Sequence, residues 1–150
     1  MIHLIRTDSH NPDLESLIQD LDRYLRVLDK GDATFYAQYN QLVNINEVVI
    51  AYRGDKAVGC GAIKKYSEER VEVKRMYVAE RSRGMSVASS ILTELESWAK
   101  ELGFSSCILE TGRNNPRAIA FYEKMGYGEM DNFGQYMGVK TSICLRKNLT

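Results

Sequence analysis

A short loop rich in arginine, serine and glycine separates a β-forming run from a long amphipathic run near the middle of the chain. It carries Arg83, Gly84 and Ser86, and Ala88 follows just beyond it. The first backbone N–H groups of a helix have no partner within the helix, and the helix dipole adds partial positive charge there. The loop and the helix start therefore predict a pyrophosphate site that needs no metal. The other interpretation is an ordinary helix start with solvated arginines.

A second helix start follows at Asn115-Pro116, where asparagine is a favourable N-cap and proline fits the first helical position. Side chains at helical spacing continue through Tyr122 to a stop at Gly126. The chain contains neither G-x-G-x-x-G nor G-x-x-x-x-G-K-[ST], so neither motif supports a Rossmann or P-loop fold.

Residues 78–92 resemble motif A of the GNAT N-acetyltransferases, whose core is Arg/Gln-x-x-Gly-x-Gly/Ala. Arg83, Gly84 and Ala88 match, whereas Ser86 stands where the family usually has glycine and Glu80 where it has proline. Residues 109–127 resemble motif B more specifically, because five positions match in order and spacing: Asn115, Ala118, Tyr122, Gly126 and Tyr127. The resemblance covers residues 59–149 well, and earlier residues match only in their order of elements.

The resemblance implies that acetyl-CoA is the cosubstrate, with its pyrophosphate on the loop and its pantetheine arm along the preceding strand. The phosphate contacts would come from Arg83, Gly84, Met85, Ser86, Val87 and Ala88. The pantetheine contacts would come from the backbone of Met76 and Val78, and further contacts from Asn115, Ala118 and Tyr122. Serine is small and can still present its N–H, so we expect binding to survive the departure at Ser86.

Tyr122 is the candidate general acid. Amine attack on a thioester expels a thiolate, and a phenol with a pKa near ~10 can help to protonate a thiol that titrates near ~8.5. Without the motif, the alternative is that Tyr122 only packs beside Phe121. Tyr127 and Tyr136 are weaker candidates for the same role.

Glu72 is the candidate general base, because an ammonium must lose a proton before it attacks. Strand alternation predicts that it lies on the same side as Lys74, Met76 and Val78. Glu110 on the facing strand is the second candidate. Two alternatives stay open: Glu72 is a solvated carboxylate paired with Lys74 or Arg70, or ordered water replaces a dedicated base.

Hydrophobic periodicity predicts the order β-α-(α)-β-β-β-α-β-α-β-β, which is typical of an α/β fold around one mixed sheet. We expect one domain over residues 1–150, and residues 33–46 are ambiguous between a helix and an irregular loop. The helix at 86–102 should join two parallel neighbours. The resemblance adds a GNAT-type sheet of about six or seven strands with splayed central strands and about four flanking helices. Strands are predicted at 2–6, 47–53, 56–66, 70–78, 105–111, 127–133 and 141–147, and the other helices at 11–28 and 115–125.

Composition narrows the class of partner. Twenty basic residues balance twenty acidic ones, which disfavours a nucleic-acid-binding protein. The three cysteines lie far apart without a CxxC pair, so we expect buried free thiols and no metal site. The longest apolar run, residues 48–52, is too short to span a membrane, and no signal peptide is recognised, so we expect a cytoplasmic protein. The family makes a homodimer possible.

We therefore expect an acetyl-CoA-dependent N-acetyltransferase that acts by direct attack in a ternary complex. Its acceptor would be a primary amine of a small molecule or of an amino-acid- or peptide-like compound. The alternative is a non-catalytic acyl-CoA-binding sensor or interaction module, which Tyr122 disfavours and Ser86 weakly favours. The acceptor pocket is expected from residues 22–46 and 131–140, lined by Tyr24, Tyr36, Tyr39 and Tyr136 with Asp29 and Asp32 nearby. Core packing and solvated acids explain these residues equally well.

Overall fold

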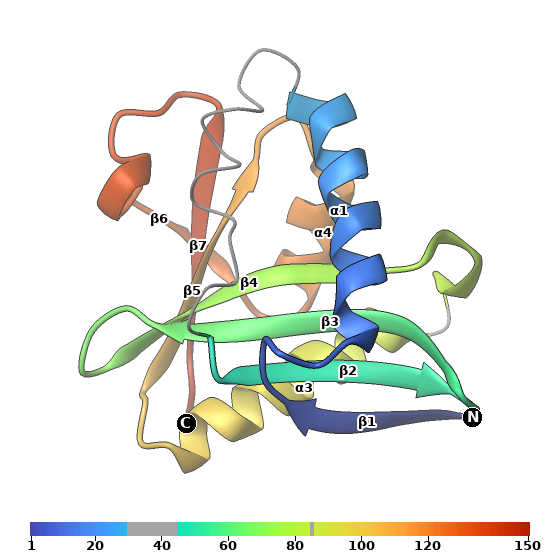
Figure 1. Cartoon of the computed structure of the whole chain (residues 1–150). Coiled ribbons are helices and arrows are strands. Elements are labelled where there is room, and N and C mark those ends of the chain that lie inside the picture. Colours follow the sequence, from blue (N-terminus) through green and yellow to red (C-terminus); the bar gives the residue numbers. More distant parts are fainter. Residues whose placement is uncertain (30–44, 85) are drawn as a thin grey trace.

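One twisted sheet of seven strands carries helices on both faces (Figure 1). The computed structural model describes residues 1–29, 45–84 and 86–150. The strands are β1 Ile2–Thr7, β2 Glu47–Arg53, β3 Lys56–Lys65, β4 Arg70–Val78, β5 Ser106–Gly112, β6 Gly128–Met130 and β7 Ser142–Asn148. The α-helices within the described residues are α1 Asp13–Asp29, α3 Val87–Glu101 and α4 Pro116–Lys124, and short 3₁₀ helices form at η2 Glu80–Ser82 and η3 Gly134–Tyr136.

The strand order β1-β2-β3-β4-β5-β7-β6 confirms the predicted mixed α/β sheet. Neighbouring strands are antiparallel except for β4 and β5, which are the parallel pair expected around the helix at 86–102. Most of the ambiguous stretch at 33–46 lies outside the described residues. The closing strand predicted at 127–133 is shorter, because β6 spans only Gly128–Met130.

The centre of the sheet splays, as the resemblance implied. β4 and β5 pair only from Arg70 opposite Ser106 to Glu72 opposite Ile108. Both strands lie wholly within the described residues. Strand β4 continues to Val78 and β5 to Gly112, but over these stretches the two strands do not pair with each other. The splay leaves a gap in the sheet that side chains or a ligand must fill.

Helix α1 packs on one face of the sheet and α3 on the other (Figure 1). Asn11 caps α1, which begins close to the start of the helix predicted at 11–28, because the N–H of Asp13 donates to Asn11 Oδ1 at 2.9 Å. Apolar side chains of α1 bury against alternate residues of β2 and β3, and α3 covers the opposite set. Each fully buried leucine or isoleucine contributes roughly 1.5–3 kcal/mol. The packing of α1 and α3 on the two faces of the sheet holds the C-terminal end of β4, where the loop begins.

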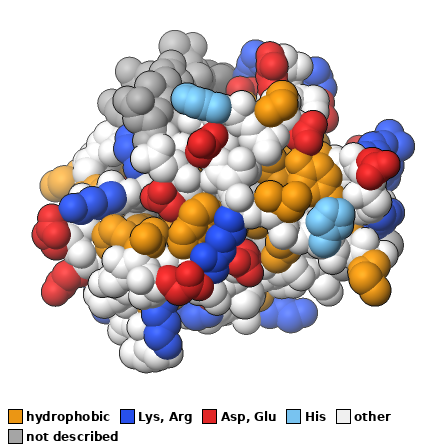
Figure 2. Space-filling view, turned by 60° about the horizontal axis from the view of Figure 1, so that its bottom comes forward, with side chains coloured by type: hydrophobic (Ala, Val, Ile, Leu, Met, Phe, Trp, Pro, Cys, Tyr) orange, Lys and Arg blue, Asp and Glu red, His pale blue; other side chains and the backbone are white. Residues whose placement is uncertain are grey.

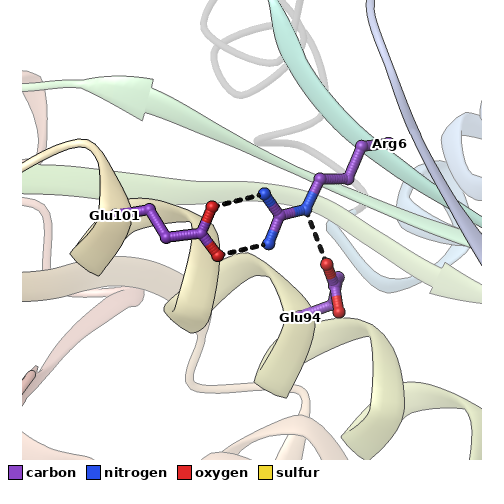
Figure 3. Close-up of polar contacts among 3 residues, drawn as sticks. All are labelled: Arg6, Glu94 and Glu101. Atoms are coloured by element: carbon purple, nitrogen blue, oxygen red, sulfur yellow. Dashed lines mark hydrogen bonds and ion pairs between the residues drawn. The ribbon is translucent and has the colours of Figure 1, made fainter.

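Arg6 ties the edge strand β1 to α3 (Figure 3). Its Nη1 and Nη2 atoms donate to the two carboxylate oxygens of Glu101 at 2.8 Å each, and Nε donates to Glu94 at 2.6 Å. The guanidinium also lies over the Trp98 ring, 4.9 Å from its centroid. Exposed ion pairs contribute little, but a bidentate pair has better geometry. Arg6 therefore helps to orient the helix whose first turn meets the loop.

Basic and acidic side chains are interspersed over the face shown in Figure 2, and neither sign gathers there into a broad field. Among the residues described, none of the helices combines the length and the apolar character that crossing a bilayer requires.

Gly61 of β3 lies close to side chains of α3 and to Met76 of β4. A methyl group built there would come 2.5 Å from Met76 Sδ and 2.9 Å from side-chain atoms of both Ile91 and Leu95. We expect Gly61→Ala to lower the free energy of unfolding by about 1–3 kcal/mol, because overpacking forces its neighbours to move. Urea denaturation measures this. Gly128→Ala is the matched control, since nothing lies within 4 Å of its added methyl group, and an equal loss in both variants would contradict the expectation.

Candidate active site

A cavity of about 610 Å³ lies where β4 and β5 splay apart. We call its two parts the loop side and the α1 side, according to the face of β4 on which they lie. The loop side contains the loop, the first turn of α3 and α4, with Met76, Val78, Ser82, Arg83, Gly84, Ser86, Val87, Ala88, Asn115, Ala118 and Tyr122. The α1 side contains Leu21, Tyr24, Leu25, Glu72, Lys74, Arg75, Tyr77, Glu110 and Tyr136. Of the predicted catalytic and cofactor-binding residues, only Met85 lies outside the described residues.

Arg83 lies between the two sides. Its Nε atom donates to the carbonyl oxygen of Val78 at 3.0 Å, which holds the side chain across the end of β4. The guanidinium carbon lies 5.5 Å from the centroid of the Tyr24 ring and 5.7 Å from that of Tyr77. Such a cation is positioned by two aromatic faces and keeps further N–H groups for an anion.

The first turn of α3 offers backbone donors to the cavity. Its N-cap, Ser86, makes no side-chain capping hydrogen bond to the helix. The earliest N–H groups of the helix therefore keep their capacity to donate to a ligand. Gly84 has φ +78°, and no atom of the described residues other than its chain neighbours lies within 4 Å of the position of a β-carbon there. The open space at Gly84 is compatible with the predicted close approach of a phosphate to this backbone.

Ser86 adopts φ +63°, in the left-handed region that glycine favours. This conformation gives a physical reason why glycine is usual at the position. Serine pays a modest strain there, whereas a β-branched residue at positive φ is an outlier.

Two substitutions at Ser86 test this explanation. We expect Ser86→Gly to retain affinity for acetyl-CoA and Ser86→Val to lower it at least about tenfold, because valine would move the first turn of α3. Isothermal titration measures both variants. Equal affinities for the glycine and valine variants would show that the backbone conformation at this position does not govern binding.

Ser82 is a site residue that the sequence analysis missed. Its side chain is completely buried, lines the loop side, and has an Oγ atom without a hydrogen-bond partner in the described part of the chain. Buried hydroxyl groups are usually paired, because an unsatisfied one is costly. The sequence carried no signal for it, since a serine in a polar loop is normally solvated.

Asn115 and Tyr122 come together through α4. The Asn115 Oδ1 atom accepts from the N–H of Ala118 at 3.3 Å, which confirms the predicted N-cap. Tyr122 is buried, and its ring makes edge contacts with Phe121 and Tyr127 at centroid distances of 5.1 and 5.7 Å. Burial alone raises the pKa of the Tyr122 phenol well above its ordinary value. The hydroxyl therefore keeps its proton at neutral pH and can act as a donor.

A bulge in β4 corrects the predicted alternation. Cys60 pairs with Tyr77, but Ala62 pairs with Lys74, so one extra residue enters β4. Arg75 has φ +57° at this point. Met76 and Val78 consequently face the α3 core, while Glu72 and Lys74 lie on the α1 side. The prediction that all four share one side is wrong, because strict period-two alternation fails at a bulge.

The α1 side collects acidic groups from both splayed strands. Glu72 Oε2 lies 3.4 Å from Lys74 Nζ, so the pairing proposed between these residues is present. Burial raises the pKa of the Glu72 carboxyl, and the positive charge of Lys74 opposes this rise. Glu110 accepts a hydrogen bond of 2.7 Å from Ser142 Oγ. Tyr136 is buried beside both carboxyl groups, whose negative charge adds to the burial that raises its pKa.

The other tyrosines separate into two groups. Tyr24 and Tyr136 line the α1 side as predicted, and Tyr36, Tyr39 and Asp32 lie outside the described residues. Tyr127 does not line the cavity and donates to Glu96 at 2.8 Å, so its hydroxyl is occupied elsewhere.

The cysteines do not supply a nucleophile. All three are buried free thiols, as predicted, and none lines the cavity. Burial is the main cause that raises the pKa of Cys60 and of Cys107 to about 12 and that of Cys144 to about 11. A thiol at such a pKa holds little thiolate at neutral pH. Within the described ranges, no three His, Cys, Asp or Glu residues form a group that would hold a metal ion.

Comparison with known proteins identifies the same segments. The model of the acetyltransferase (GNAT) family matches residues 14–127. A protein of Azospirillum brasilense named IAA acetyltransferase is 35% identical over 141 residues, covering 89% of this chain and 88% of its own length.

Solved structures show the same fold. A candidate acyl-CoA N-acyltransferase of Klebsiella pneumoniae superposes with a TM-score of 0.85 at 26% identity, covering 100% of this chain and 99% of its own. A GNAT acetyltransferase of Elizabethkingia anophelis with acetyl-CoA bound superposes with a TM-score of 0.73 at 17% identity, covering 99% of this chain and 98% of its own.

Proposed function

The chain belongs to the GNAT family of acetyltransferases, and from this premise we propose that it transfers the acetyl group of acetyl-CoA to a primary amine. The acceptor is a small molecule or an amino-acid- or peptide-like compound, and the amine attacks directly in a ternary complex. The observation that carries the proposal is the cavity that fills the splay. It joins phosphate-binding groups on one side of β4 to carboxylates on the other.

The loop side fits the cosubstrate. Backbone N–H groups at the start of α3, the orphaned hydroxyl of Ser82 and the guanidinium of Arg83 are the donors that a pyrophosphate needs. Beyond Glu72 the edge of β4 that faces β5 is not paired with that strand. The backbone of Met76 and Val78 on this edge suits the amide groups of the pantetheine arm. Bound acetyl-CoA supplies the thioester that the amine attacks.

The reacting groups divide between the two sides. The ammonium first loses one proton to become the attacking amine. A new C–N bond then forms as the C–S bond breaks, and the second proton that the nitrogen loses balances the one that the thiolate takes. Glu72 on the α1 side accepts the amine proton, and Tyr122 on the loop side donates to the thiolate. Direct transfer is favoured over a covalent intermediate, because the three thiols are buried away from the cavity.

The test is isothermal titration with acetyl-CoA, followed by thiol release across a panel of amines. Binding together with amine-dependent release supports the acetyltransferase. Tight binding without release from any amine would favour the sensor or interaction module instead. Failure to bind acetyl-CoA would overturn both.

A homodimer, a cytoplasmic location and the exclusion of nucleic acid are predictions from the family and the composition. Size-exclusion chromatography with light scattering measures the first of them directly.

A further inference from the structure

Arg75 has donors on the α1 side for which the described residues offer no acceptor. Its side chain is only 3% exposed, and it lines the cavity. Nη2 donates to Asp22 of α1, but the Nε and Nη1 atoms are buried with no hydrogen-bond partner among the residues described. A guanidinium is always charged and can only donate hydrogen bonds. The one N–H of Nε and the two of Nη1 are therefore free to donate to oxygen atoms of a ligand.

The bulge explains why this guanidinium faces the cavity. Regular alternation would turn Arg75 away from Lys74, toward the α3 core. The extra residue and the positive φ of Arg75 place both consecutive cations on the α1 side instead. A non-glycine residue at positive φ is strained, and such strain is commonly found at functional sites.

We propose that the amine acceptor is a zwitterion, an amino acid or a close analogue, whose carboxylate accepts hydrogen bonds from Arg75. This inference rests on the proposed function. Glu72 and Glu110 on the same side receive the ammonium end, and Arg75 receives the carboxylate end. The spacing of opposite charges within one cavity thus matches the two charges of an amino acid.

The balance of charge favours a carboxylate over a phosphate. Of the charged side chains described on the α1 side, Lys74 and Arg75 are cations. The facing anions are Glu72, Glu110 and Asp22, which contacts Arg75 from α1. Arg83, between the two sides, adds a third cation over the rings of Tyr24 and Tyr77. Three cations then balance three anions, and a phosphate dianion would leave this arrangement with a net charge of −2. A zwitterion carries one positive and one negative charge, so it leaves the net charge of the site unchanged.

Matched pairs of acceptors test the proposal with the wild-type protein. Each common L-amino acid is compared with its α-carboxamide in the thiol-release assay with acetyl-CoA. The carboxamides have less basic amines, so kcat/KM is referred to the concentration of the ammonium form, which is the form that Glu72 and Glu110 are proposed to receive. For the preferred amino acid we expect kcat/KM to exceed that of its carboxamide by roughly 10- to 150-fold, the value of a hydrogen bond to a charged group.

Two variants test whether Arg75 causes the preference for amino acids over their carboxamides. Arg75→Gln is expected to lower kcat/KM for amino acids by a similar factor and to bring the ratio over the carboxamides close to one. Asp22→Asn leaves Arg75 in place and removes its competing carboxylate, so it should keep or raise the ratio. If Arg75→Gln does not fold, the wild-type pairs and Asp22→Asn still decide, because a fall of the ratio in Asp22→Asn would overturn the proposal.

The outcomes separate this inference from the proposed function. Thiol release from simple amines with no preference for carboxylates overturns the zwitterionic acceptor and leaves the acetyltransferase intact. A preference that survives unchanged in a folded Arg75→Gln variant also overturns it. Absence of acetyl-CoA binding, or binding without release from any amine, contradicts the proposed function and the inference together.

Discussion

Replacing Tyr122 with phenylalanine is expected to lower kcat about 10²- to 10⁴-fold, the usual range for a positioned proton donor. The substitution removes only the hydroxyl group. The ring should keep its edge contacts with Phe121 and Tyr127, so α4 should remain in place. The affinity for acetyl-CoA should therefore change little, and the loss should fall on kcat rather than on binding.

Tyr122 can still donate a proton although its hydroxyl group is buried. It raises the pKa of the phenol, because the anion loses its solvation. In the proposed complex the departing sulfur lies beside Tyr122, where the same loss of solvation would raise the pKa of the thiol. The two groups therefore stay close in acidity, and a hydrogen bond to the developing thiolate is strongest in a poorly solvated site.

Single-turnover and steady-state thiol release measure this prediction, with titration of acetyl-CoA as the binding check. Tyr66→Phe is the matched control, because Tyr66 packs against Phe133 and does not line the cavity. Equal activity in both variants would remove Tyr122 from the chemistry and reduce it to a packing residue.

The sequence predicted most of the fold because its signals were local. Asn11 and Asn115 cap helices through their own side chains, and Gly126, the expected end of a helix, has φ +98°. The loop before α3 was recognisable for the same reason, since a helix start binds phosphate through its backbone. Such features depend on a few neighbouring residues.

The remainder of the site depends on contacts between distant segments. The bulge at Arg75 depends on how β4 pairs with β3, and no single residue in the sequence indicates it. The partner of Arg75 lies on α1, and the burial of Ser82 follows from the packing of the loop against the sheet. Period-two alternation therefore placed Glu72 correctly in the cavity but assigned Met76 and Val78 to the wrong face.

Replacing Glu72 with glutamine is expected to lower kcat/KM at least about 10²-fold and to abolish the acidic limb of its pH profile. In the wild type, protonation of the carboxyl removes the base, so activity rises with pH through the pKa of Glu72. Burial places that pKa above its ordinary value, against the weaker opposing effect of Lys74. Deprotonation of the acceptor amine at higher pH is a separate limb, which the variant should retain.

Glu110→Gln is the matched variant, because Glu110 lines the same side of the cavity from the facing strand. Loss of the acidic limb in Glu110→Gln, with the limb intact in Glu72→Gln, would assign the base to Glu110. Retention of the limb in both variants would point to water as the proton acceptor and would contradict a carboxylate base.

The same carboxyl should leave a mark on stability, and its sign is fixed. A group whose pKa is raised by folding contributes stability that is fully present below its unfolded pKa, near ~4.3 for glutamate, and lost as pH rises through the folded value. The free energy of unfolding of the wild type should therefore fall relative to Glu72→Gln across this window, as activity rises. Urea denaturation at a series of pH values measures the difference. If activity rises with no such fall in relative stability, the group that titrates in catalysis is not Glu72.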